Sequence, residues 1–114
     1  MSAPITTHVL DTSIGGPAQG VAVILRVQTA GAEWKEIARG VTDSNGRVAN
    51  LLSPGKLAEG NYRLRFEIGA YFSARQSASF YPFVEVTFAV NDGEQHYHVP
   101  LLVSPYGYTT YRGS

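Results

Sequence analysis

The sequence of 114 residues contains no cysteine. Disulfides, thiolate metal sites and a cysteine nucleophile are therefore excluded. Charge is also scarce: charged residues make up 16% of the chain, and nine basic residues balance nine acidic ones. Since neither sign forms a run, the chain lacks the electrostatic footprint of a protein that binds nucleic acid or an anionic membrane. We expect neither nucleic acid nor membrane among its partners.

Long hydrophobic runs are missing as well. No apolar run approaches the roughly 20 residues of a membrane span, and residues 1–8 have neither the basic nor the apolar region of a signal peptide. A cytoplasmic location is the resulting expectation. The length predicts a single domain, 1–114, that is large enough to bury a core. The low charge also suggests that copies of the chain cover part of its surface.

Short alternating stretches separated by turn signals dominate what is present. The stretch 34–42 also fits a helical period, but its β-rich neighbours favour a strand. One short helix is expected over 70–79, ended by the approach to Pro82. The pattern as a whole predicts an all-β protein, an antiparallel β-sandwich of seven to eight strands. The expected strands are 5–11, 21–28, 34–42, 62–68, 83–90, 96–103 and 106–111.

The clearest turn signal is Asp43-Ser-Asn-Gly46. Asn-Gly supplies the positive φ angles that tight turns require. Arg47 follows directly, so the turn anchors its side chain. The ordinary interpretation of such an arginine is a solvated surface residue, and Arg112 near the C-terminus is open to the same interpretation.

Three histidines are candidates for chemistry. His8 lies within the first expected strand, where a lone histidine is usually a structural group. His96 and His98 are two residues apart and therefore on one face of a strand. Two imidazoles on one face can bind a metal, but no third ligand lies at short spacing, so the metal signal is weak.

The last 21 residues gather aromatic side chains. Tyr106, Tyr108 and Tyr111 lie close together beside a proline and a glycine. An aromatic cluster at a chain end usually marks an interface. Taken one by one, these residues predict a self-associating β-sandwich and no reaction.

Three motifs, in order along nearly the whole chain, resemble the transthyretin-like family. They are Ile5-Thr-Thr-His-Val-Leu-Asp11, Val41-Thr-Asp-Ser-Asn-Gly-Arg47 and the ending from His96 to Ser114. The final Tyr-Arg-Gly-Ser is similar to the mark of the enzymatic branch, the 5-hydroxyisourate hydrolases. The thyroid-hormone carriers that share the fold lack this ending and the histidine–arginine set.

The resemblance implies a catalytic set of His8, Arg47, His98 and Ser114. It also implies that Tyr111 contacts the substrate together with His8 and Arg47, and that His96 supports the site without reacting. Water activation is expected from His8 and His98 jointly, with no choice between them. The family further implies a homotetramer, a dimer of dimers, with active sites where two dimers meet.

The implied reaction is hydrolysis of 5-hydroxyisourate at its N1–C6 amide, in the degradation of urate to allantoin. No cofactor and no metal are expected, since opening an activated ring needs neither. Two alternatives stay open: a carrier that binds a small aromatic ligand without chemistry, and a structural β-sandwich that only self-assembles.

Overall fold

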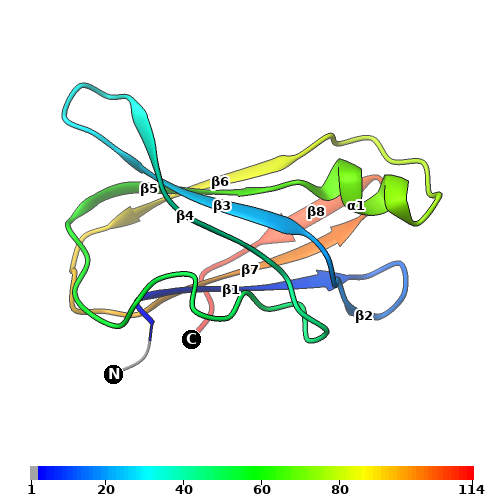
Figure 1. Cartoon of the computed structure of the whole chain (residues 1–114), viewed down its shortest axis with the longest axis horizontal. Coiled ribbons are helices and arrows are strands. Elements are labelled where there is room, and N and C mark those ends of the chain that lie inside the picture. Colours follow the sequence, from blue (N-terminus) through cyan, green and yellow to red (C-terminus); the bar gives the residue numbers. More distant parts are fainter. Residues whose placement is uncertain (1–2) are drawn as a thin grey trace.

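The alternating stretches form two four-stranded β-sheets in the computed structural model, which describes residues 3–114 (Figure 1). One sheet has the strand order β2-β1-β7-β8 and the other has the order β4-β3-β5-β6. The elements are β1 (Ile5–Asp11), β2 (Gly16–Pro17), β3 (Ala22–Gln28), β4 (Trp34–Val41), β5 (Gly60–Phe66), α1 (Ile68–Ala74), β6 (Val84–Val90), β7 (Tyr97–Ser104) and β8 (Gly107–Thr110).

The predicted β-sandwich with one short helix is confirmed. Each expected strand is present to within two residues at either end, including the ambiguous 34–42, which forms β4. The eighth strand is β2, a two-residue segment between the expected strands 5–11 and 21–28. Its pairing with β1 extends over only two residue pairs, which is too short to leave an alternating pattern in the sequence.

One pairing departs from the antiparallel pattern. β1 and β7 run parallel over seven residue pairs, whereas every other strand pair named here is antiparallel. These two strands lie at opposite ends of the chain, so no hairpin dictates their direction. The parallel register aligns Thr6 with His98 and His8 with Pro100.

The helix begins and ends earlier in the chain than the sequence pattern predicts. It was expected over 70–79 but spans Ile68–Ala74. Gln76 adopts a left-handed φ of 57°, and the N–H groups of Gln76 and Ser77 donate to carbonyls of the last turn. This Schellman arrangement ends the helix before Pro82 has any influence, and it uses a glutamine where a glycine is usual.

The core lies between the two sheets. Nineteen hydrophobic residues of the range 3–114 are buried there, and the side chains of β5 alternate, with Tyr62, Leu64 and Phe66 inward. Within the described residues, no helix is long and apolar enough to cross a membrane. Because the inward-facing side chains fill this core, the outward-facing residues of each sheet are the ones available to a site.

Candidate active site

Two histidines lie on the outer face of the β2-β1-β7-β8 sheet. Buried and partly exposed residues alternate along β1, which turns Thr7 into the core and His8 outward. The same alternation along β7 turns His98 outward. Because Thr6 pairs with His98, His8 lies two residues further along the neighbouring strand. The two imidazoles therefore share one face on adjacent strands.

The turn after β4 is rigid, as the Asn-Gly signal predicts. The Oδ1 atom of Asp43 accepts the backbone N–H of Arg47 at 3.1 Å and that of Asn45 at 2.8 Å. These two hydrogen bonds hold the pKa of the Asp43 carboxyl below its usual value. The carboxylate thus fixes the backbone from which the Arg47 side chain projects.

Arg47 lies beside His8. Its backbone forms an isolated antiparallel bridge with His8, and the N–H of Val9 donates to the Gly46 carbonyl at 2.8 Å. Gly46 has a φ of 76°, and a Cβ there would overlap the Val9 carbonyl oxygen. The Arg47 side chain is exposed, and its guanidinium has no hydrogen-bond partner in the described part of the chain. Its donors are available to a ligand.

His98 is held on one side of its ring only. Nδ1 lies 2.8 Å from Oγ1 of Thr6, whereas Nε2 has no hydrogen-bond partner among residues 3–114. No buried side-chain nitrogen or oxygen in that range lacks a partner. Nε2 must therefore be reached by solvent, where a substrate or a water molecule can meet it.

The charge state of His98 suits a base. Partial burial of the ring lowers its pKa below the ordinary value of 6.5, and the positive charge of Arg47 acts in the same direction. The imidazole is therefore neutral at neutral pH, with one lone pair available.

The C-terminal tail folds back against His98. The N–H of Gly113 donates to the His98 carbonyl at 2.8 Å. A Cβ on Gly113 would lie 2.5 Å from Cδ2 of His98, so a larger residue would displace the ring. Ser114 follows directly and is exposed. The structure thus brings the last residue of the expected catalytic set next to the strand that carries His98.

Tyr111 lies on the same outer face. The register between β7 and β8 pairs Leu101 with Thr110, which places Tyr111 beside Pro100, the residue that pairs with His8 on the other side of β7. Its side chain is 56% exposed. This position is compatible with the substrate contact that the resemblance implies.

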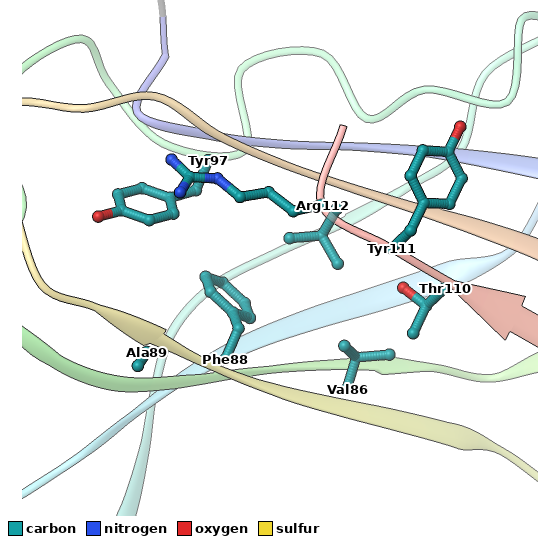
Figure 2. Close-up of a pocket in the computed structure, with 8 residues that line it drawn as sticks. Val86, Phe88, Ala89, Tyr97, Thr110, Tyr111 and Arg112 are labelled. Carbon is teal, nitrogen blue, oxygen red and sulfur yellow. The ribbon is translucent and has the colours of Figure 1, made fainter. Parts of the chain in front are cut away.

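The Arg112 side chain points in a different direction from that of Tyr111 (Figure 2). Figure 2 shows it over the ring of Tyr97, whereas the ring of Tyr111 turns away from Phe88. The Arg112 guanidinium lies 4.5 Å from the Tyr97 ring centroid and donates to Gln95 at 2.9 Å. Arg112 is exposed, as expected of a tail residue, and its contacts also tie the tail to the segment before β7.

An apolar cavity of about 200 Å³ lies between β6 and the tail, and Figure 2 shows the residues that line it. Its lining includes Val86, Phe88, Tyr97 and the three residues from Thr110 to Arg112. His8, Arg47 and His98 do not line it. The candidate active site is instead an open face of the sheet.

Nothing in the site favours a metal. Among the described residues, no group of three or more histidine, cysteine, aspartate or glutamate side chains could hold a metal ion. Both ring nitrogens of His96 are already engaged, with the Ala3 carbonyl and the Thr6 hydroxyl. The i, i+2 histidine pair therefore serves hydrogen bonding.

Sequence reasoning missed Thr6 and Gly113 as residues of the site, and it identified Gly46 only as a turn residue. Thr6 precedes His8 by two residues, so the strand period already placed its hydroxyl on the face of the histidines. The sequence does not show that Gly46 and Gly113 lie against imidazole rings, because these contacts depend on which segments the fold brings together.

The fold and the site together define a transthyretin-like β-sandwich with a histidine–arginine cluster on the outer face of one sheet. Residues 5–113 match the model of the HIUase/Transthyretin family, and the chain belongs to this family.

Curated relatives span the whole chain. It is 46% identical to the 5-hydroxyisourate hydrolase of Mus musculus over 114 residues, which cover 99% of this chain and 97% of the mouse protein. It is 47% identical to the 5-hydroxyisourate hydrolase of Halalkalibacterium halodurans over 119 residues, which cover 100% of both proteins.

Solved structures of both branches share the fold. Sea bream transthyretin, in complex with thyroxine, superposes with a TM-score of 0.92 at 37% identity, covering 97% of this chain and 95% of that one. Klebsiella pneumoniae 5-hydroxyisourate hydrolase superposes with a TM-score of 0.84 at 37% identity, covering 98% and 100%. The fold alone therefore does not separate carrier from enzyme.

Proposed function

We propose that this chain hydrolyses 5-hydroxyisourate to 2-oxo-4-hydroxy-4-carboxy-5-ureidoimidazoline, a step in the degradation of urate to allantoin. Hydrolases that act on this compound, by name, are full-length relatives at 46% and 47% identity. The observation that carries the proposal is the convergence of His8, Arg47 and His98 on one sheet face from three distant segments.

The reaction requires a nucleophilic water molecule, and we assign its activation to His98. The Nε2 atom of His98 is open to solvent, and its low pKa keeps it unprotonated at neutral pH. A well-placed general base contributes about a hundred- to ten-thousandfold to a rate. His8 has no side-chain hydrogen-bond partner in the part of the chain described, so its ring is less firmly oriented than that of His98.

The amide opens in two steps. As His98 takes a proton from water, the water oxygen adds to C6 of the substrate, and the C6 carbonyl electrons move onto its oxygen. The guanidinium of Arg47 stabilises this oxyanion. The oxyanion then re-forms the carbonyl, the C6–N1 bond breaks, and N1 takes the proton from the imidazolium. The product carries a carboxyl group at C6 and a ureido group that contains N1.

The remaining residues of the set bind and orient the substrate. His8, beside Arg47, contacts the polar edge of the heterocycle and assists proton transfer. Tyr111 packs on the flat ring, and the exposed Ser114 orients the substrate or relays a proton. No step needs a metal or a redox cofactor.

We also propose that the chain is one hydrolase domain, 1–114, that assembles as a homotetramer, a dimer of dimers. Large exposed aromatic side chains support self-association, among them Phe80, Tyr106 and Tyr108. In the part of the chain that the structure describes, β6 and β8 are edge strands without a neighbour on one side, and proteins commonly cover such edges. A second copy over the open sheet face would wall the site from water. The cytoplasmic location stays a prediction.

An ultraviolet assay tests the proposed function. Urate and urate oxidase generate 5-hydroxyisourate, and its decay is followed with and without the protein, because the compound also decays unaided. We expect the protein to accelerate the decay, and a chelator to leave the rate unchanged. Arg47→Gln should lower kcat/KM by about a hundred- to a thousandfold. The control Arg39→Gln alters an exposed arginine of the other sheet and should not change it.

A carrier is the second candidate, because transthyretin superposes on this chain so well. If the chain is a carrier, thyroxine should bind tightly in a calorimetric titration, and the decay of 5-hydroxyisourate should stay at the rate of the no-protein control. That pair of results would overturn the proposed enzyme.

A further inference from the structure

A chain of hydrogen bonds leads from the N-terminal segment to His98. Nδ1 of His96 lies 2.7 Å from the Ala3 carbonyl oxygen, and its Nε2 lies 2.9 Å from Oγ1 of Thr6. The same Thr6 oxygen lies 2.8 Å from Nδ1 of His98. The two imidazole rings are nearly parallel, 16° apart with centroids at 6.4 Å. One hydroxyl therefore joins both histidines.

The chemistry of these groups gives the chain a direction. A carbonyl oxygen can only accept, so Nδ1 of His96 carries a proton and donates it to Ala3. In neutral His96, Nε2 then has no proton and must accept from the Thr6 hydroxyl. The only proton of Thr6 is thereby used, and its oxygen must accept from His98. Nδ1 of His98 consequently carries the ring proton, and Nε2 carries the lone pair.

We propose that Thr6 and His96 are positioning residues that fix the tautomer of His98, so that Nε2 is always the basic nitrogen. The hydrogen bond at one imidazole nitrogen decides the protonation of the other. An imidazole free in water favours the opposite tautomer, with its proton on Nε2, which could not accept a proton from water. The inference rests on the proposed function, because it concerns how His98 acts in that reaction.

The backbone holds this chain of groups in place. The parallel register aligns Thr6 with His98, and the N–H of Tyr97 donates to the Pro4 carbonyl at 2.9 Å. From the tail, Nη2 of Arg112 donates to the His96 carbonyl at 3.3 Å. The N-terminal segment is thus held by β7, and the segment around His96 is held by the tail. These contacts preorganise the chain of hydrogen bonds that leads to His98.

Thr6→Val is the direct test, because valine keeps the shape and strand preference of threonine and removes only the hydroxyl. We expect kcat to fall about tenfold or more with KM little changed, as when a partner that orients a histidine is lost. Thr6→Ser restores the hydroxyl and should restore kcat. The control Thr87→Val changes an exposed threonine on the other sheet and should behave as wild type.

The tautomer itself can be read independently of activity. In the folded protein labelled with ¹⁵N-histidine, long-range ¹H–¹⁵N spectra distinguish a proton on Nδ1 from one on Nε2. We expect His98 of the wild type to carry its proton on Nδ1, and Thr6→Val to shift it toward Nε2. A wild-type proton on Nε2, or an unchanged tautomer in Thr6→Val, would overturn the inference. A shifted tautomer with an unchanged rate would instead overturn His98 as the base of the proposed function.

Two variants of His96 separate its contacts. Glutamine places an amide near the position of Nε2 and can still accept from Thr6, whereas asparagine reaches only toward Ala3. We expect His96→Gln to retain most of kcat and the Nδ1 proton of His98, and His96→Asn to lose both as Thr6→Val does. Wild-type behaviour of His96→Asn would contradict the role of His96.

Discussion

At the scale of single residues, the role of His98 depends on the groups around its ring more than on its being a histidine. The sequence marks three histidines, but only the structure shows that one of them has a fixed nitrogen and an open one. His8 faces the same side without a side-chain partner in the described residues, and His96 uses both of its nitrogens. The three imidazoles thereby fall into three different roles.

The low pKa of His98 predicts the acid side of the pH profile. As pH falls, His98 keeps its lone pair until its own pKa, below 6.5, so the acid limb of kcat/KM should lie below 6.5. Arg47→Gln removes a positive charge and should move this limb upward, whereas Arg47→Lys should leave it low. The charges facing His98 are those of Arg47, His96 and His8. An acid limb above 6.5 in the wild type would contradict this assignment.

The same shift has a consequence for stability. Below pH about 6.5 the unfolded chain binds a proton on this histidine that the folded chain does not bind until its lower pKa is reached. His98 therefore makes folding less favourable as pH falls through that window.

At the scale of elements, the site depends on segments that have no regular structure. The turn at Asp43 carries Arg47, and the tail beyond β8 carries Gly113. Each segment meets a histidine-bearing strand at an isolated backbone bridge: Arg47 pairs with His8, and Gly113 pairs with His98. Such loops contribute function because the sandwich beneath them is rigid.

The tail yields a prediction with a matched control. Gly113→Ala places a methyl group against the His98 ring, so we expect a clear loss of kcat with little change in the thermal unfolding temperature. A Cβ on Gly107, the first residue of β8, meets only Oγ of Ser104 at an ordinary 3.7 Å. Gly107→Ala should therefore keep wild-type activity. Equal activity of the two variants would show that the tail does not position His98.

A buried hydrogen bond links the helix to β1. The Tyr71 hydroxyl donates to Oδ2 of Asp11 at 2.7 Å, and burial together with this carboxylate raises the pKa of Tyr71 to about 12. Tyr71→Phe should lower the free energy of unfolding by about 1–3 kcal/mol, measured in guanidinium, without lowering activity. Tyr81→Phe is the control, since no hydrogen bond of the Tyr81 hydroxyl occurs in the described residues, and it should change stability by less than about 0.5 kcal/mol.

Sequence patterns predicted the strands well because a strand that buries every second side chain has hydrophobic residues at every second position, as with Tyr62, Leu64 and Phe66. The helix was misplaced because its end depends on a left-handed glutamine, which composition does not reveal. The motifs indicated His8, Arg47 and His98 as one site. The hydroxyl of Thr6, which joins two of the histidines, required the parallel register of β1 and β7.

At the scale of the whole molecule, the sheet face that carries the candidate active site is open. Large aromatic side chains, such as Tyr108 on the edge strand β8, are exposed. We expect sedimentation equilibrium to report four times the mass of one chain. Tyr108→Lys places a charge on the edge strand β8 and should lower that mass. Ile37→Lys, on the opposite edge strand β4, is the control and should leave it unchanged. A monomer at micromolar concentration would contradict the tetramer.

The central claim is that His98 is the base that activates water against 5-hydroxyisourate. The most direct measurement is kcat for His98→Ala in the ultraviolet assay, with the unfolding temperature recorded for the same sample. The account predicts a fall of about a hundred- to ten-thousandfold in a protein that remains folded. Decay of 5-hydroxyisourate at the wild-type rate in that variant would contradict it.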